Sequence, residues 1–206
     1  MIYSALMLST DQGTQVVNYA RQILTTYTKK EPFPKEIKIE GLQKKQGVFV
    51  TLHTFPSLQL RGCIGIPEPV MVLQQAIKEA AISVTHDPRF LPLSVEELPG
   101  IVVEATILTP PELLSVMHPQ EYLNSISIGT HGLIVEQGFR KGLLLPQVAV
   151  EETWDVETFL CHTCMKAGLP ADAWYEVSTR IYTFTGQIFY EKTPKGRVME
   201  KKINGS

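Results

Sequence analysis

The chain has 206 residues, of which 44% are hydrophobic and 19% are charged, and 19 Lys and Arg against 21 Asp and Glu give a formal net charge of −2. This composition is typical of a globular protein of one domain or two small lobes, and it excludes a general electrostatic attraction to nucleic acid or to an anionic membrane. The apolar runs are too short to span a bilayer, and three cysteines are too few for a disulfide framework. Because the first residues also lack the basic region of a signal peptide, we expect a cytoplasmic protein.

The first elements in the chain are predicted to be a helix and a β-hairpin. Ser9 and Gln12 have the spacing of a capping box, and apolar side chains then recur at helical spacing at Val16, Ala20, Ile23, Leu24 and Tyr27. The segment 31–34 breaks the chain with two prolines, and 47–52 is typical of a buried strand. The segment 59–66, Gln-Leu-Arg-Gly-Cys-Ile-Gly-Ile, is expected to be the second strand of the hairpin.

A second helix and a third strand follow. Pro67 and Pro69 precede a run whose apolar positions have helical spacing, namely Leu73, Ala76, Ile77, Ala80, Ala81 and Val84. A polar loop at 85–90 ends this helix, and Ser94 with Glu97 predicts a capping box on a short turn. The alternation of Ile101, Val103, Ala105 and Ile107 then predicts a strand that stops at two prolines.

The second half of the chain is expected to contain a short helix at 118–123 and two strands, 132–137 and 143–146, joined by a tight turn. A helix with an apolar face from Val156 to Ala167 follows, and the last strand is expected to be one continuous element at 180–191. Since strands and helices do not alternate regularly, we predict an α+β fold with mostly antiparallel sheets flanked by helices. The residues 196–206 are expected to be a polar tail.

Six short motifs in this chain, taken together, resemble the AMMECR domain family. They are Leu60-Arg61-Gly62-Cys63-Ile64-Gly65, Asp87-Pro88-Arg89-Phe90-x-Pro92, Glu97-Leu98, His131-Gly132-Leu133, Leu145-Pro146-Gln147-Val148-Ala149 and Trp154-Asp155. They occur in the family's order over nearly the whole chain.

The resemblance implies an α+β protein of two unequal lobes with a cleft between them. We expect the larger lobe at about 1–55 plus 117–195 and the smaller lobe at about 56–116. The family has no settled biochemical activity. Its microbial members often occur together with a radical-SAM-type enzyme and a Memo-type, dioxygenase-like protein, which implies a shared pathway with these partners.

Cys63 is the first candidate catalytic residue. Arg61 nearby would lower the pKa of its thiol, and both side chains would project to one face of a regular strand. The alternative is a small buried residue whose flanking Gly62 and Gly65 allow close packing. We expect Arg61, Gly62 and Gly65 to contact a ligand in the cleft, and we expect Cys63 to be the most reactive thiol. The opposite hypothesis for Arg61 is a buried ion pair with Asp87.

Three further residues are candidates for the same site. Asp87 and Arg89 are candidate ligand-binding residues, since an arginine can bind a carboxylate or phosphate through two hydrogen bonds, but they can equally pair with each other. His131 is a candidate catalytic base for Cys63, and a histidine that only bonds to backbone is the alternative.

The pair Cys161 and Cys164 has the spacing of a redox or metal motif, yet it falls within a predicted helix and lacks a second pair of ligands. We therefore predict plain helix packing there, with no tightly bound metal and no cofactor. Two function classes remain open: an enzyme or small-ligand-binding protein that uses the cleft, and a non-catalytic protein-interaction or scaffold module of the same pathway.

Overall fold

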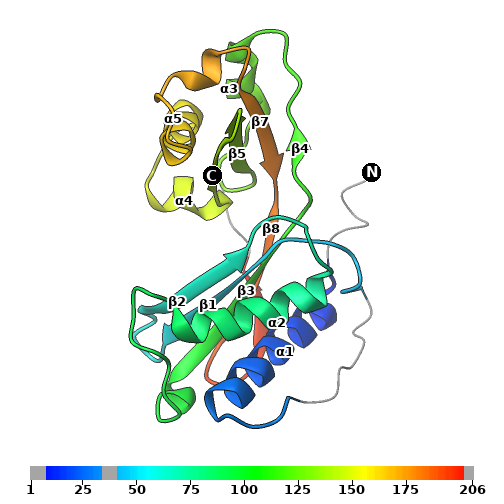
Figure 1. Cartoon of the computed structure of the whole chain (residues 1–206), viewed down its shortest axis with the longest axis vertical. Coiled ribbons are helices and arrows are strands. Elements are labelled where there is room, and N and C mark those ends of the chain that lie inside the picture. The colour runs from blue at the N-terminus through cyan, green and yellow to red at the C-terminus, as the bar shows by residue number, and fades with distance from the viewer. Residues whose placement is uncertain (1–7, 34–40, 202–206) are drawn as a thin grey trace. The chain divides into compact units, whose positions relative to one another are not determined.

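Two compact units make up the chain in this computed structural model, which describes residues 8–33 and 41–201. The first unit contains the described residues up to Pro110 and from Gln187 onward, and the second unit is Pro111–Gly186 (Figure 1). The chain therefore passes twice between the units.

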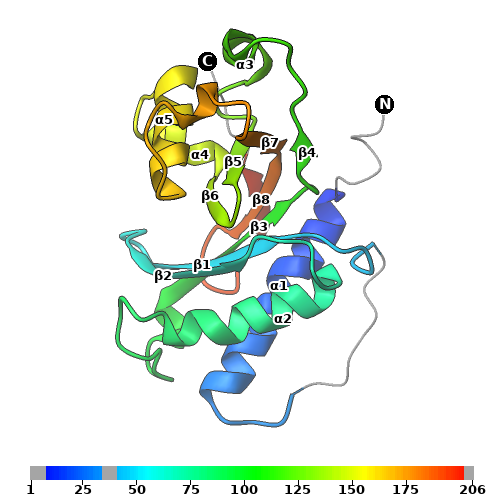
Figure 2. The same cartoon turned by 45° about the horizontal axis from the view of Figure 1, so that its top comes forward.

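The first unit is a five-stranded sheet with two helices on one face (Figure 2). The strand order is β2-β1-β3-β8-β9, with the bounds Leu60–Ile66, Val48–Thr54, Ile101–Leu108, Gly186–Glu191 and Val198–Lys201. The helices α1 (Thr10–Thr28) and α2 (Leu73–Ser83) bury their apolar faces against this sheet. The main core lies between these layers and includes Val16, Ile23, Leu24, Val50, Leu52, Ile77, Val103 and Phe189.

The helices of the first unit form where the sequence predicts them. Ser9 caps α1 and forms a complete capping box with Gln12, which satisfies backbone donors that the first turn leaves open. The apolar face of α2 is fully buried from Leu73 to Ala81. Tyr27 differs from the expectation for α1, because 37% of it is exposed near the end of that helix.

The strands β1 and β2 form the predicted hairpin, with β2 at the edge of the sheet. Thr51 lies opposite Cys63 on one side and opposite Glu104 on the other, so these three side chains share one sheet face. Since Val50 and Leu52 point into the core, this face is the one away from α1 and α2.

The expected lobe boundary between residues 55 and 56 differs from the observed division. It would separate β1 from β2, which the backbone ladder joins in one sheet. The two-lobe boundaries drawn from the sequence thus do not coincide with the compact units of the structure.

The second unit is a four-stranded sheet with helices packed against it. The strand order is β4-β7-β5-β6, with the bounds Glu112–Leu113, Arg180–Phe184, Gly132–Gln137 and Arg140–Leu144. Its helices are α3 (Tyr122–Ser125), α4 (Pro146–Glu151) and α5 (Val156–Lys166). A second core forms here around Leu133, Val135, Phe159, Leu160, Trp174 and Ile181.

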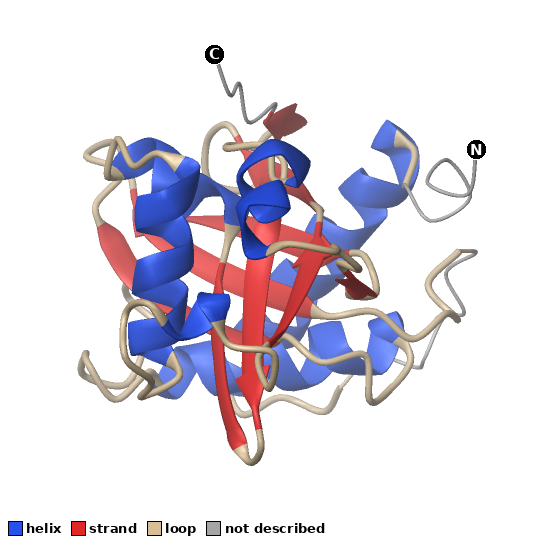
Figure 3. Ribbon diagram, turned by 90° about the horizontal axis from the view of Figure 1, so that it is seen from above, coloured by secondary structure: helices blue, strands red, loops and turns tan. Residues whose placement is uncertain are grey.

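Short 3₁₀ helices complete the fold, at Val84–His86 (η2), Leu98–Gly100 (η3), Pro119–Glu121 (η4) and Ala173–Tyr175 (η5). Helices and strands are mixed along the chain without regular alternation (Figure 3). The pairs β1–β2, β1–β3, β4–β7, β5–β6, β5–β7 and β8–β9 are antiparallel. The α+β class is therefore confirmed.

Three details of the chain differ from the sequence prediction. The expected strand at 180–191 is two strands in different sheets, because β7 ends at Phe184 and β8 begins at Gly186. The expected strand at 143–146 ends at Leu144, since Pro146 instead opens α4, where its missing N–H is not needed. In the expected tail, Val198–Lys201 forms β9 by pairing with β8, and 202–206 lie outside the described residues.

Candidate functional site

Asp87 fastens the loop after α2 to the edge of the sheet. Its carboxylate accepts hydrogen bonds from the backbone N–H of Cys63 at 2.8 Å and of Arg89 at 3.0 Å. The Cys63 N–H belongs to an edge strand, so it would otherwise have no partner in the ladder. Only 2% of Asp87 is exposed, and hydrogen bonds from the Arg89 guanidinium hold the pKa of this carboxyl far below its usual range.

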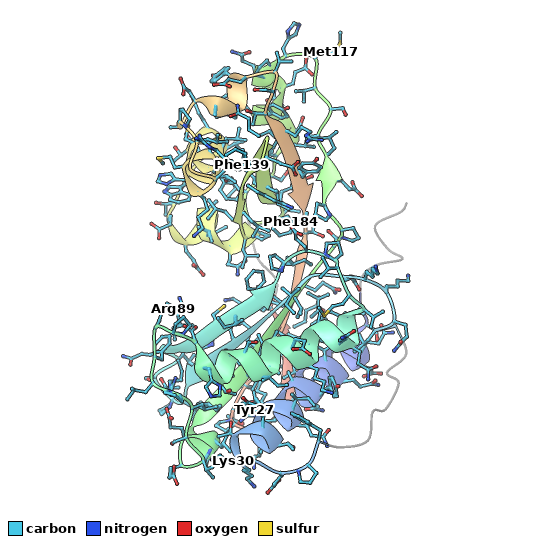
Figure 4. The ribbon with its side chains drawn as sticks, viewed as in Figure 1. Tyr27, Lys30, Arg89, Met117, Phe139 and Phe184 are labelled. Atoms are coloured by element: carbon cyan, nitrogen blue, oxygen red, sulfur yellow. The ribbon has the colours of Figure 1, made fainter. Side chains whose placement is uncertain are left out.

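Arg89 completes this loop-to-strand contact and also faces solvent. Its Nε and Nη2 donate to the two oxygens of Asp87 at 3.0 and 2.7 Å, and Nη2 also donates to the Cys63 carbonyl at 3.2 Å. The Arg89 side chain is nevertheless 56% exposed, at one edge of the first unit in Figure 4. Its Nη1 donates to no acceptor among residues 8–33 and 41–201.

Arg61 pairs with Glu97 rather than with Asp87. Its Nε and Nη2 donate to the two carboxylate oxygens at 2.6 and 3.1 Å, and Nη2 also reaches the Leu91 carbonyl at 2.9 Å. The Arg61 side chain is only 12% exposed, which contrasts with the free cleft cation expected from the sequence. The backbone explains this orientation, because the register shift between Leu52 and His53 leaves Arg61 without a cross-strand partner and breaks its alternation with Cys63.

Phe90 contacts both arginines. The guanidinium carbons of Arg61 and Arg89 are each 5.7 Å from the centre of its ring, within cation–π range. The ring therefore stabilises the position of both cations.

Gly62 and Gly65 are explained by close packing. A Cβ on Gly62 would lie 3.1 Å from the Val84 side chain, and a Cβ on Gly65 would overlap the Phe49 ring. Gly62 is buried, so it does not open the surface beside Arg61. Contact of either glycine with a ligand stays a prediction.

The thiol of Cys63 is half-buried and is not part of a disulfide. The Thr51 hydroxyl donates to its Sγ at 3.2 Å. Burial raises the pKa of the Cys63 thiol above its ordinary value, with Glu104 and Asp87 adding to the rise, while the Thr51 hydrogen bond and the charge of Arg89 oppose it. The expectation of a thiolate activated by Arg61 is therefore not supported by the surroundings of the thiol.

His131 lies in the second unit, directly before β5, and its Nδ1 accepts a hydrogen bond from the backbone N–H of Ser127 at 3.2 Å. Burial lowers the pKa of His131, against a weaker opposing effect of Glu112, so the imidazole is neutral near pH 7. Because Cys63 belongs to the first unit, a thiol–base pair between them stays a prediction.

The pair Cys161 and Cys164 lies on α5, as predicted. Cys164 is fully buried in the second core, and burial raises the pKa of its thiol to about 11. Between them, His162 stacks on Trp154 with ring centres 3.9 Å apart. Over residues 8–33 and 41–201, no three His, Cys, Asp or Glu side chains are grouped so that they could hold a metal ion.

Two residues of this site were not predicted as part of it. Glu97 was expected only to cap a turn, and its Oε2 does accept the Ser94 backbone N–H at 2.9 Å, but the same carboxylate also holds Arg61. No sequence pattern pointed to Thr51, because only the strand register shows that it faces Cys63.

Comparisons with known proteins agree with this fold. The AMMECR1 family model matches residues 17–189. The chain belongs to the AMMECR1 family. Among similar proteins, Protein MJ0810 of Methanocaldococcus jannaschii is 54% identical over 198 residues, covering 96% of this chain and 98% of the relative. Protein MK0488 of Methanopyrus kandleri is 46% identical, covering 95% and 96%.

A solved structure supports the AMMECR1 fold directly. The crystal structure of uncharacterized protein PH0010 from Pyrococcus horikoshii matches with a TM-score of 0.84 and 44% identity, covering 95% of this chain and 98% of that one. The AMMECR1 match includes both units.

Among the described residues, no helix has the length and apolar content needed to cross a membrane.

Proposed function

We propose that this AMMECR1-family protein binds a small carboxylate-bearing metabolite through Arg89, at the surface beside Cys63. The observation that carries the proposal is the combination of fixation and exposure at Arg89. Asp87 and Phe90 hold the guanidinium in one orientation, and more than half of the side chain still faces solvent. Such a pre-organised cation loses little conformational entropy when it binds an anion.

The charge around Arg89 favours a ligand with a single negative charge. Asp87 offsets the charge of Arg89, and Glu97 offsets that of Arg61, so the site has no surplus of positive charge for a dianion. The outward Nη1 can donate to a carboxylate oxygen, and charge-assisted hydrogen bonds of this kind are among the stronger polar contacts.

We propose ligand binding here and no catalytic step. The raised pKa of Cys63 keeps its thiol protonated near pH 7, so catalysis by Cys63 and His131 stays a prediction for the ligand-bound protein. On the family resemblance we also propose that radical-SAM-type and Memo-type proteins of the cytoplasm supply or consume the same ligand.

The test is metabolite profiling of the purified protein, alone and mixed with its radical-SAM-type and Memo-type neighbours. We expect a carboxylate to be released on denaturation of the wild type and to be lost from Arg89→Ala. Arg180→Ala is the matched control, because Arg180 is 57% exposed and also pairs with a carboxylate, that of Glu136. A carboxylate that both variants retain equally would contradict the proposal.

A docking function is the second candidate, and one feature of the second unit favours it. Phe139, at the β5–β6 turn, is 95% exposed, and Val177 is fully exposed. Gln137 donates hydrogen bonds to Glu176 and Ser178, which brings this turn and the loop of Val177 together. If this apolar pair docks the Memo-type protein, Phe139→Ser with Val177→Ser abolishes binding in calorimetry, while Met117→Ser, which is 88% exposed in the wild type, leaves it unchanged.

A further inference from the structure

A pocket of about 380 Å³ lies in the first unit, on the sheet face away from α1 and α2. Strands β1, β3, β8 and β9 and the two turns that follow β1 and β8 supply its lining, which includes His53, Glu104, Tyr190, Lys192 and Lys201. Its volume is within the range of small-molecule sites. None of the motifs that identify the family falls in this lining.

The polar side chains of the pocket are largely unpaired. Within residues 8–33 and 41–201, the imidazole of His53, the hydroxyl of Tyr190 and the ammonium groups of Lys192 and Lys201 make no hydrogen bond or ion pair. Buried polar groups usually have partners, and His53 and Tyr190 are partly buried, whereas Lys192 and Lys201 are exposed. Four unpartnered groups that all can donate therefore converge on one hollow, which is the arrangement that an oxyanion with several acceptor oxygens requires.

The lining has a surplus of positive charge. Lys192 and Lys201 bring two positive charges, whereas the carboxylate of Glu191 is already paired with Arg21 in the core. Glu104 brings one negative charge, next to Thr51 in the sheet. A carboxylate has about four acceptor positions, so Glu104 can accept a hydrogen bond from a ligand hydroxyl beside the partner that it already has.

We propose that this pocket binds a small phosphorylated molecule with free hydroxyl groups, with its phosphate at Lys192 and Lys201 and a hydroxyl at Glu104. His53 and Tyr190 donate the remaining hydrogen bonds to the phosphate. This site is separate from the carboxylate site at Arg89, and it does not depend on the proposed function.

His53 reports on occupancy of the pocket. Burial lowers the pKa of His53, with a further contribution from the positive charge of Lys201. The imidazole is therefore neutral near pH 7 and donates through one nitrogen. A bound phosphate dianion raises the pKa of His53, because it favours the charged imidazolium.

The experiment follows the imidazole resonances of His53 by NMR, assigned with His53→Gln, while inorganic phosphate or glycerol 3-phosphate is added at constant ionic strength. We expect both anions to raise the pKa of His53, with glycerol 3-phosphate binding more tightly. The double substitution Lys192→Met and Lys201→Met should weaken binding about tenfold or more, since it removes both positive charges that contact the phosphate. Glu104→Gln should remove the preference for glycerol 3-phosphate.

Two variants serve as controls. Lys166→Met removes an exposed lysine of α5, and Arg89→Ala removes the other proposed site, so both should respond to the two anions as the wild type does. The proposal is overturned if neither anion moves the His53 resonances, or if Lys166→Met weakens binding as much as the double substitution.

Discussion

At the scale of single residues, the two arginines of the family motifs have different tasks. Arg61 is nearly buried and bonds to both oxygens of Glu97, whereas Arg89 is bonded to Asp87 and still exposed. The first arrangement predicts an effect on stability, and the second predicts an effect on binding.

Arg61→Ala should lower the free energy of unfolding by about 1.5–3 kcal/mol, because it removes charge-assisted hydrogen bonds from a part-buried pair. Arg61→Lys should recover only part of this loss, since an ammonium cannot match both oxygens of Glu97 as the planar fork does. Chemical denaturation measures both values. If Arg61→Ala unfolds at the same denaturant concentration as the wild type, the ion pair with Glu97 has no structural role.

The raised pKa of Cys63 predicts a slow thiol. Its alkylation by iodoacetamide should follow the thiolate fraction, with a midpoint above the ordinary cysteine pKa of about 8.5. Cys164 should react more slowly still, because it is fully buried and its pKa is about 11. Mass spectrometry of the labelled peptides over pH 6–10 tests this, and rapid labelling of Cys63 with a midpoint below pH 8 would restore the activated-thiolate hypothesis.

At the scale of elements, two carboxylates fix segments that are distant in sequence. Asp87 fastens the loop after α2 to the edge strand β2, and Glu191 fastens α1 to β3 and β8. Both carboxylates are buried, and both accept hydrogen bonds from backbone and guanidinium groups. We therefore expect a measurable loss of stability when either carboxylate is replaced by its neutral amide.

Asp87→Asn should cost about 1.5–3 kcal/mol of stability at pH 7. The pKa of Asp87 is depressed in the folded protein, so its contribution is fully present above the unfolded value of about 3.9 and is lost as pH falls through the folded value. The stability difference between wild type and Asp87→Asn should therefore shrink as pH is lowered from 4 to 2. A difference that stays constant over this range would show that the charge of Asp87 does not stabilise the loop.

Glu191→Gln should destabilise the protein by about 3–5 kcal/mol, because it leaves the buried guanidinium of Arg21 without its counter-charge. Glu136→Gln is the matched control, since Glu136 pairs with the exposed Arg180 and should cost at most about 1 kcal/mol. Thermal unfolding of both variants decides the comparison. Equal losses in the two would contradict a structural role for the buried pair.

At the scale of the whole molecule, local patterns predicted the helices well, and long-range pairing was the part that they missed. Ser9 with Gln12 located the start of α1, and the apolar spacing located α5, because both signals depend on neighbours in sequence. The break between Phe184 and Gly186 could not be foreseen, since an apolar run does not tell to which sheet each half pairs. Strand β9 was not predicted for the same reason. It is a strand because it pairs with β8, and this pairing cannot be inferred from its neighbours in sequence.

For the candidate site, the sequence indicated which residues lie close together better than how they pair. The motifs singled out Arg61, Cys63, Asp87 and Arg89, and the structure brings these together at one edge of the first unit. The sequence does not show which carboxylate pairs with which arginine, because the bulge at Arg61 turns that side chain toward Glu97. His131 lies in the other unit, and its pairing with Cys63 stays a prediction.

The central claim is that Arg89 binds a carboxylate at the surface beside Cys63, and a thermal-shift comparison tests it most directly. Wild type, Arg89→Ala and Arg180→Ala are each melted with and without a panel of small monocarboxylates at constant ionic strength. We predict that at least one carboxylate raises the Tm of wild type and Arg180→Ala by about 3–6 °C once it reaches about ten times its Kd, and leaves Arg89→Ala unchanged. An equal rise in all three proteins, or no rise in the wild type with any carboxylate, would contradict the claim.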